Sequence, residues 1–149
     1  MFEPFRVIDD PDSLLRLNRA QLDVLFSRSN AGPVPAGTAR GTALIASGTP
    51  LAEPIARLVR LFAWQGKTFD AASRTLMNRV TPAGLPAVRA RVYEDASWHD
   101  GRPCIVLDYS TTSSVARYIR DEIRQIGPNL YLGKVFFAGF PVFGFALAF

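Results

Sequence analysis

The chain has few of the residues on which common metal and redox sites depend. Its 149 residues include one cysteine, Cys104, and one histidine, His99. A lone cysteine excludes an internal disulfide framework, so we expect a buried thiol and a cytoplasmic protein. A lone histidine excludes a histidine-based metal site, and we predict neither a metal nor a cofactor. His99 falls in the turn that Asp100 and Gly101 predict, where an exposed polar side chain is the ordinary outcome.

Long apolar runs and clusters of positive charge are also missing. The apolar run at residues 135–149 is fifteen residues long and contains Pro141, whereas a membrane-spanning helix needs roughly 20 residues, so we predict no transmembrane segment. The first twelve residues are acidic and do not resemble a secretion signal.

The net charge is +4, but fifteen arginines are dispersed from Arg6 to Arg124, so we predict no nucleic-acid partner. No glycine-rich phosphate-binding loop occurs.

The N-terminal half contains two helical patterns and one strand. A chain of this length suits one domain, 1–149, with an N-terminal helical segment at 1–30 and a barrel at 37–149. Asp10 and Pro11 predict a helix start, and the apolar pattern carries that helix to Phe26. A second apolar stripe with helical spacing predicts a helix at about 51–62, after a strand at 37–46.

Beyond residue 64 the pattern is that of short strands separated by turns. The predicted strands lie at residues 67–69, 74–81, 87–94, 103–109, 120–126, 130–137 and 142–149, with a brief helix at 115–119. Antiparallel strands joined by short turns predict a mainly β protein with accessory helices, either a lipocalin-like antiparallel β-barrel or a strongly curved sheet. The alternative is an α+β sheet with helices on one face.

The last strand alternates bulky and small side chains. Phe143, Phe145 and Phe149 share one face, and Gly144, Ala146 and Ala148 share the other. We expect the phenylalanines to point into the barrel and the small residues to lie beneath a helix, because small side chains allow a helix to approach closely.

Three segments resemble small bacterial lipocalin-like proteins that are named for a Gly-x-Trp-x-Gly signature. These are GTARG at residues 37–41, TPL at 49–51 and WQGKTF at 64–69, within about a quarter of the chain. Ala39 stands where the signature has tryptophan. The arrangement of the C-terminal strands is similar to that of other calycin-type barrels. The resemblance implies a cavity that holds a small hydrophobic molecule.

Two aspartates are candidate acid or base catalysts. Asp108 interrupts the apolar strand 103–109, and Asp121 lies in the strand 120–126 with the charged Glu122 beside it. A carboxylate buried in a barrel needs a partner or has a raised pKa, which suits proton transfer. The alternatives are a structural ion pair or a cap of residues 110–114 for Asp108. Glu122 shares its face with Arg120 and Arg124, so we expect a solvated charged surface there.

The candidate ligand-binding residues are aromatic side chains on several strands and the two lysines of the chain. Lysine side chains at one end of an apolar cavity would orient a ligand by its polar group. The predicted set is Trp64, Lys67, Phe69, Tyr93, Tyr109, Tyr131, Lys134, Phe143 and Phe145.

Three functions are compatible with this pattern. The first is binding of a small hydrophobic ligand such as a lipid, terpenoid or polyketide-like molecule in the barrel. The second is a cofactor-free enzyme, of cyclase, isomerase or hydrolase type, that acts on such a molecule through Asp108 or Asp121. The third is a homodimer or other homo-oligomeric interaction module that uses the phenylalanine face.

Overall fold

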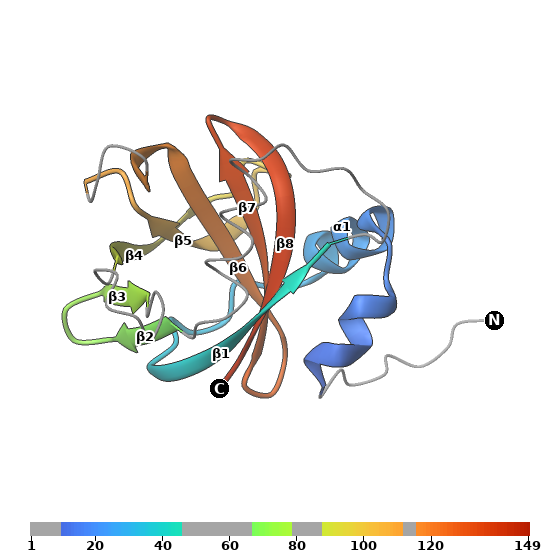
Figure 1. Ribbon diagram of the computed structural model, residues 1–149, viewed down its shortest axis with the longest axis horizontal. Helices are drawn as coiled ribbons and strands as arrows, with labels where there is room; N and C mark the ends of the chain where they lie inside the picture. The colour runs from blue at the N-terminus through green and yellow to red at the C-terminus, as the bar shows by residue number, and fades with distance from the viewer. Residues whose placement is uncertain (1–9, 46–66, 79–87, 112–115) are drawn as a thin grey trace, which may run out of the picture.

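A computed structural model of the chain describes residues 10–45, 67–78, 88–111 and 116–149. The described part is mainly β, with a closed antiparallel barrel on one side and two short helical segments packed against its outer wall (Figure 1). Trp64 and the helix predicted at 51–62 lie outside the described residues. No helix in the described ranges is both long and apolar enough to cross a membrane.

Eight strands follow one another around the barrel in chain order, and the pairing of the first with the last closes it. Each strand pairs antiparallel with the next, and short turns join β2 to β3, β4 to β5, β6 to β7 and β7 to β8. The strands are β1 (Gly37–Leu44), β2 (Lys67–Asp70), β3 (Thr75–Asn78), β4 (Val88–Ala96), β5 (Pro103–Asp108), β6 (Ile119–Gly127), β7 (Leu130–Phe137) and β8 (Phe140–Ala148). The barrel form of the predicted fold is thus confirmed, and the α+β alternative is excluded.

Alternation along the strands gives the protein two apolar cores. One face of each strand contributes to the cluster inside the barrel, including Ile105 and Leu107 of β5. The other face of β5 contributes Cys104 and Val106 to a second cluster outside the wall, beneath the N-terminal helices. Both faces of β5 are therefore buried, which explains its nearly continuous apolar sequence.

The N-terminal segment is two helices rather than the single helix that the sequence predicted. A short 3-10 helix, η1 (Pro11–Arg16), is capped by Asp10, as expected. Leu17 is then extended, and Asn18 begins α1 (Arg19–Arg28) through a capping box with Gln21. This second cap was missed because the apolar pattern continues across the break. A 3-10 turn, η2 (Ala116–Tyr118), replaces the brief helix predicted at 115–119.

The alternating last strand is oriented as predicted. Phe143, Phe145 and Phe149 pack with the cluster inside the barrel. Ala146 and Ala148 belong to the outer cluster beneath α1 and η1. Phe145 lies over Gly133 of β7 so closely that a Cβ on this glycine would come within 2.2 Å of the phenyl ring. The missing side chain at Gly133 thus makes room for an aromatic ring.

Candidate functional site

A buried polar cluster lies inside the otherwise apolar barrel. Lys67 begins β2, Tyr109 directly follows β5, and Asp121 lies in β6. The three side chains come together because the barrel curves β2 around to face β5 and β6. Lys67 is 3% exposed, and Tyr109 and Asp121 are fully buried. We call these three residues the inner cluster.

The inner cluster combines an amine, a phenol and a carboxyl group at short range. Lys67 Nζ donates a hydrogen bond of 2.7 Å to Tyr109 Oη and lies 3.6 Å from Asp121 Oδ2. Neither carboxyl oxygen of Asp121 has a hydrogen-bond partner in the described part of the chain. Buried carboxylates are normally hydrogen-bonded, so Asp121 has spare acceptor capacity inside the barrel.

Burial favours the neutral form of both ionisable groups and shifts the pKa of each accordingly. Loss of hydration lowers the pKa of Lys67 to about 8, although the nearby carboxyl of Asp121 opposes this change. Loss of hydration likewise raises the pKa of Asp121 to about 6 against the opposing effects of Lys67 and the Tyr109 hydroxyl. Near neutral pH the pair can therefore exchange protons with a bound molecule at modest cost.

Apolar and aromatic side chains surround the inner cluster. Lys67 Nζ lies 5.4 Å from the ring centre of Tyr109 and 5.7 Å from that of Phe145. Ala39 of β1 is the direct cross-strand neighbour of Lys67 and is buried in the interior cluster. Ala39 thus keeps the position beside Lys67 small.

The structure divides the sequence-predicted site residues between the two faces of the wall. Inside the barrel, with Asp121, are Lys67, Phe69, Tyr109, Tyr131, Phe143 and Phe145. Phe69 and Tyr131 both contact the ring of Phe149, and the Tyr131 hydroxyl donates to the carbonyl oxygen of Pro33.

Three predicted site residues lie on the outer face instead. Tyr93 donates a hydrogen bond of 2.9 Å to Asp108, and Asp108 accepts another from the backbone N–H of Ser110. Asp108 thus has the capping contact that was its alternative role, and it does not join Asp121. Partial burial acts to raise the pKa of Asp108, but the hydrogen bonds from Ser110 and Tyr93 together outweigh it, and the pKa is lowered. Lys134 forms an ion pair with Asp23 of α1.

The prediction that Glu122 and Arg124 form a solvated charged surface is wrong, since both side chains are fully buried. The hairpin between β4 and β5 and helix α1 cover this face of β6. Glu122 accepts hydrogen bonds from Ser97 Oγ at 2.5 Å and from the backbone N–H of Trp98 at 2.8 Å. It also pairs with Arg120 at 3.0 Å.

Arg124 is the centre of this covered network. Its guanidinium makes two hydrogen bonds of 2.7 Å to the carboxylate of Asp100, which hold the pKa of Asp100 down at about 2. It also donates to the carbonyl oxygens of Phe26, Arg102 and Pro103. We call Arg120, Glu122 and Arg124 with their partners the outer network. Its completeness indicates a structural role that joins α1 and the hairpin to the barrel.

The single histidine and the single cysteine of the chain both make structural contacts. His99 is half-buried rather than exposed: its Nε2 lies 2.9 Å from Ser27 Oγ, and its ring meets that of Phe26 edge-on. Ser27 also donates to the carbonyl oxygen of Asp23, so the histidine supplies the proton between the two side chains. Cys104 is buried, as expected, and burial raises its pKa to about 12. This thiol is therefore a poor nucleophile.

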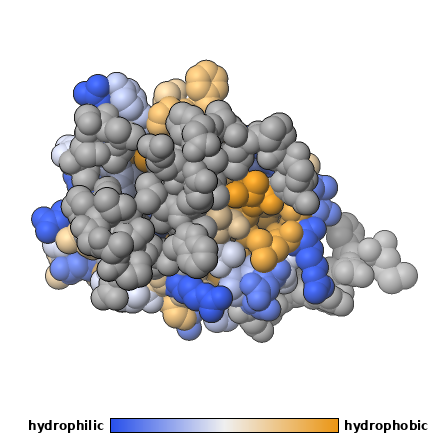
Figure 2. Space-filling view, viewed as in Figure 1, coloured by the Kyte–Doolittle hydropathy of each residue, from blue (hydrophilic) through white to orange (hydrophobic). Residues whose placement is uncertain are grey.

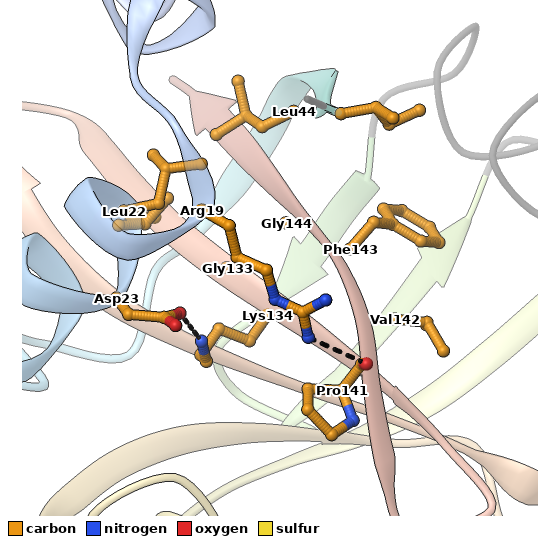
Figure 3. A pocket seen from close by; sticks show the side chains of 12 residues that line it. Arg19, Leu22, Asp23, Leu44, Gly133, Lys134, Pro141, Val142, Phe143 and Gly144 are labelled. Carbon is orange, nitrogen blue, oxygen red and sulfur yellow. Dashed lines mark hydrogen bonds and ion pairs between the residues drawn. The ribbon is translucent and has the colours of Figure 1, made fainter. Parts of the chain in front are cut away.

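A small cleft opens between α1 and the outer face of β7 and β8 (Figure 3). Its volume is about 70 Å³. Arg19 reaches across it to the carbonyl oxygen of Pro141, and the ion pair of Lys134 with Asp23 forms one wall. Apolar surface gathers where α1, β1 and β8 meet (Figure 2). Sequence reasoning missed this cleft because only the packing of α1 brings Arg19 to β8.

Comparisons with known proteins support the fold but identify no family. No family model matches the chain, and no curated protein matches it. Among solved structures, a protein from Thermomonospora curvata is similar, with a TM-score of 0.59 and 20% sequence identity. The alignment covers 89% of this chain and 87% of that one. At this identity the likeness supports the barrel fold alone.

Proposed function

We propose that the protein binds a small, mainly apolar molecule inside the barrel and that the inner cluster holds the polar group of this ligand. The observation that carries the proposal is the state of Asp121, whose two fully buried oxygens lack hydrogen-bond partners in the described part of the chain. A ligand hydroxyl that donates to Asp121 would supply the missing contact, and Lys67 would bind a ligand oxygen.

The energy of burial supports this interpretation. An ion pair removed from water is stabilising only when hydrogen bonds satisfy its remaining acceptors, and within the described residues Asp121 does not meet that condition. Similar apolar residues in place of Lys67 and Asp121 would be tolerated by the fold. The presence of both charged residues inside the barrel is therefore explained more readily by a ligand than by stability.

The number of strands in the barrel is compatible with the same proposal. An eight-stranded barrel is near the size at which the interior either fills with side chains or holds one small ligand. Ala39 keeps the position beside Lys67 small. We therefore propose that the ligand lies against Ala39, with its polar end toward Lys67 and its apolar part among the aromatic residues of the interior.

The outer cleft is the less suitable site. Its two cationic groups already have partners, because Lys134 pairs with Asp23 and Arg19 binds the carbonyl oxygen of Pro141. The homo-oligomer alternative also lacks support, since it needs the phenylalanine face on the surface, whereas Phe143, Phe145 and Phe149 pack with the interior cluster.

The test is equilibrium binding of Nile red, a neutral apolar dye, followed by displacement with octanol or octane. We expect dye fluorescence to rise with the wild-type protein and octanol to displace the dye at lower concentration than octane. The variant Ala39→Trp should lose dye binding, because the indole fills the proposed site beside Lys67.

The matched control is Lys134→Met, which removes the other lysine of the chain from the outer cleft and should bind the dye as the wild type does. Circular dichroism of each variant confirms the barrel before binding is compared. Unchanged dye binding by folded Ala39→Trp, or its loss in Lys134→Met, would contradict the proposal.

A further inference from the structure

The amine of Lys67 has surroundings that differ from those of an ordinary lysine. It is buried against Tyr109 and Phe145 in an apolar wall, and the carboxyl of Asp121 lies 3.6 Å away. Burial also favours the neutral amine, which is the nucleophilic form. A desolvated amine with an adjacent proton carrier is an arrangement that favours attack on a carbonyl group.

Asp121 and Tyr109 can carry the protons of such a reaction. The oxygens of Asp121 have no hydrogen-bond partner in the described residues, and the Tyr109 hydroxyl lies 2.7 Å from the amine. An acid is needed to protonate the departing oxygen when a carbonyl compound condenses with an amine. Asp121 is close enough to the amine to take this role, and the apolar wall limits hydrolysis of the product.

The geometry points to Lys67 as the site of a reversible imine with a small apolar aldehyde or ketone, and this inference rests on the proposed interior binding site. The amine nitrogen attacks the carbonyl carbon, and one N–H proton passes to the carbonyl oxygen to give a carbinolamine. The C–O bond then breaks, the hydroxyl leaves as water with a proton from Asp121, and the nitrogen returns its second proton to the carboxylate. The products are an imine and one water molecule.

The chain provides its own control for this chemistry, since Lys67 and Lys134 are its only lysines. Lys134 lies on the outer face, in an ion pair with Asp23, and 5.6 Å from the ring centre of Phe26. It has an acidic partner as Lys67 does but does not lie inside the barrel. A difference in reactivity between the two lysines therefore measures the effect of the barrel interior on the amine of Lys67.

The experiment incubates the wild-type protein with octanal and sodium cyanoborohydride, which reduces an imine to a stable secondary amine. Peptide mapping by mass spectrometry then measures the adduct on Lys67, Lys134 and the N-terminal amine. We expect most of the adduct on Lys67, its loss in Lys67→Arg, and its retention in Lys134→Arg. In Asp121→Asn we expect trapping to slow by roughly 100-fold, the usual scale for loss of a general acid or base.

Octanol, which binds without forming an imine, separates this inference from the proposed function. Octanol binding with no adduct on Lys67, or with equal adduct on Lys67 and Lys134, would contradict the proposed imine but not the proposed binding site. If neither octanol nor octanal binds, both proposals are wrong. The wild-type map alone decides the site of reaction, even if Lys67→Arg does not fold.

Discussion

Along β6, alternate side chains place Asp121 inside the barrel and Glu122 and Arg124 outside it, and all three are fully buried. The outer network satisfies its charges: Arg124 alone donates to Asp100 and to three carbonyl oxygens. Asp121, on the inner face, has an ion pair but no hydrogen bond in the described part of the chain. Burial alone therefore does not separate these side chains, whereas their hydrogen bonds do, and the proposed function rests on that difference.

The largest expected effect comes from breaking the outer network. Arg124→Leu removes one donor from Asp100 and one from each of three carbonyl oxygens, so we expect a loss of about 3–5 kcal/mol in the free energy of unfolding. Urea denaturation measures it. Arg120→Leu, at a partly exposed position, should cost less. A loss below about 1 kcal/mol for Arg124→Leu would show that the network is not structural.

The inner cluster should respond in the opposite way. The double variant Lys67→Met/Asp121→Leu replaces the buried pair, whose carboxylate has no hydrogen bond in the described residues, with apolar side chains. We expect it to be neutral or up to about 1–4 kcal/mol more stable than the wild type, and to lose preferential displacement of Nile red by octanol over octane. A large loss of stability would show that Lys67 and Asp121 have a structural role, as the outer network does.

A smaller effect is expected in the pH dependence of stability. The pKa of Asp121 is raised to about 6, so its contribution to the free energy of unfolding is present at low pH and falls as the pH rises from about 4 to 6. The pKa of Lys67 is lowered to about 8, so its contribution returns only as the pH rises from about 8 to 10.5.

The difference in unfolding free energy between the wild type and Lys67→Met/Asp121→Leu isolates these two groups. Plotted against pH from urea denaturation, it should place the wild type at its greatest disadvantage between about pH 6 and 8. A difference that is flat with pH would show that neither pKa is shifted by folding.

The smallest effect is expected on the outer face at Asp108. Asp108→Asn keeps an oxygen that can accept from the N–H of Ser110, so the cost should be about 1 kcal/mol or less in urea denaturation. Dye binding should not change, because Asp108 and Tyr93 lie outside the barrel. Loss of dye binding in this variant would return Asp108 to the candidate site.

Much of the barrel follows from alternation and turn chemistry. The predicted strand at 130–137 coincides with β7, and the alternation in β8 correctly assigns its phenylalanines to the interior. The same rule fails to orient β5, because both of its faces are apolar and both are buried. From the sequence, Asp108 was as good an interior candidate as Asp121.

The candidate site was predictable only in part, for the same physical reason. Asp121 has Ile123 on its own face, which favours the interior, whereas Glu122 and Arg124 form a charged row that normally faces water. The row is buried because the β4–β5 hairpin and α1 fold over it, and these contacts are distant in sequence. The proximity of Lys67 to Asp121 likewise depends on closure of the barrel.

The most direct test of the proposed interior binding site is displacement of Nile red by octanol, measured side by side on the wild type, Ala39→Trp and Lys134→Met. We expect the wild type and Lys134→Met to bind octanol tightly and folded Ala39→Trp to bind none. Equal binding by all three would contradict the proposed interior site, because the ligand would then lie outside the barrel.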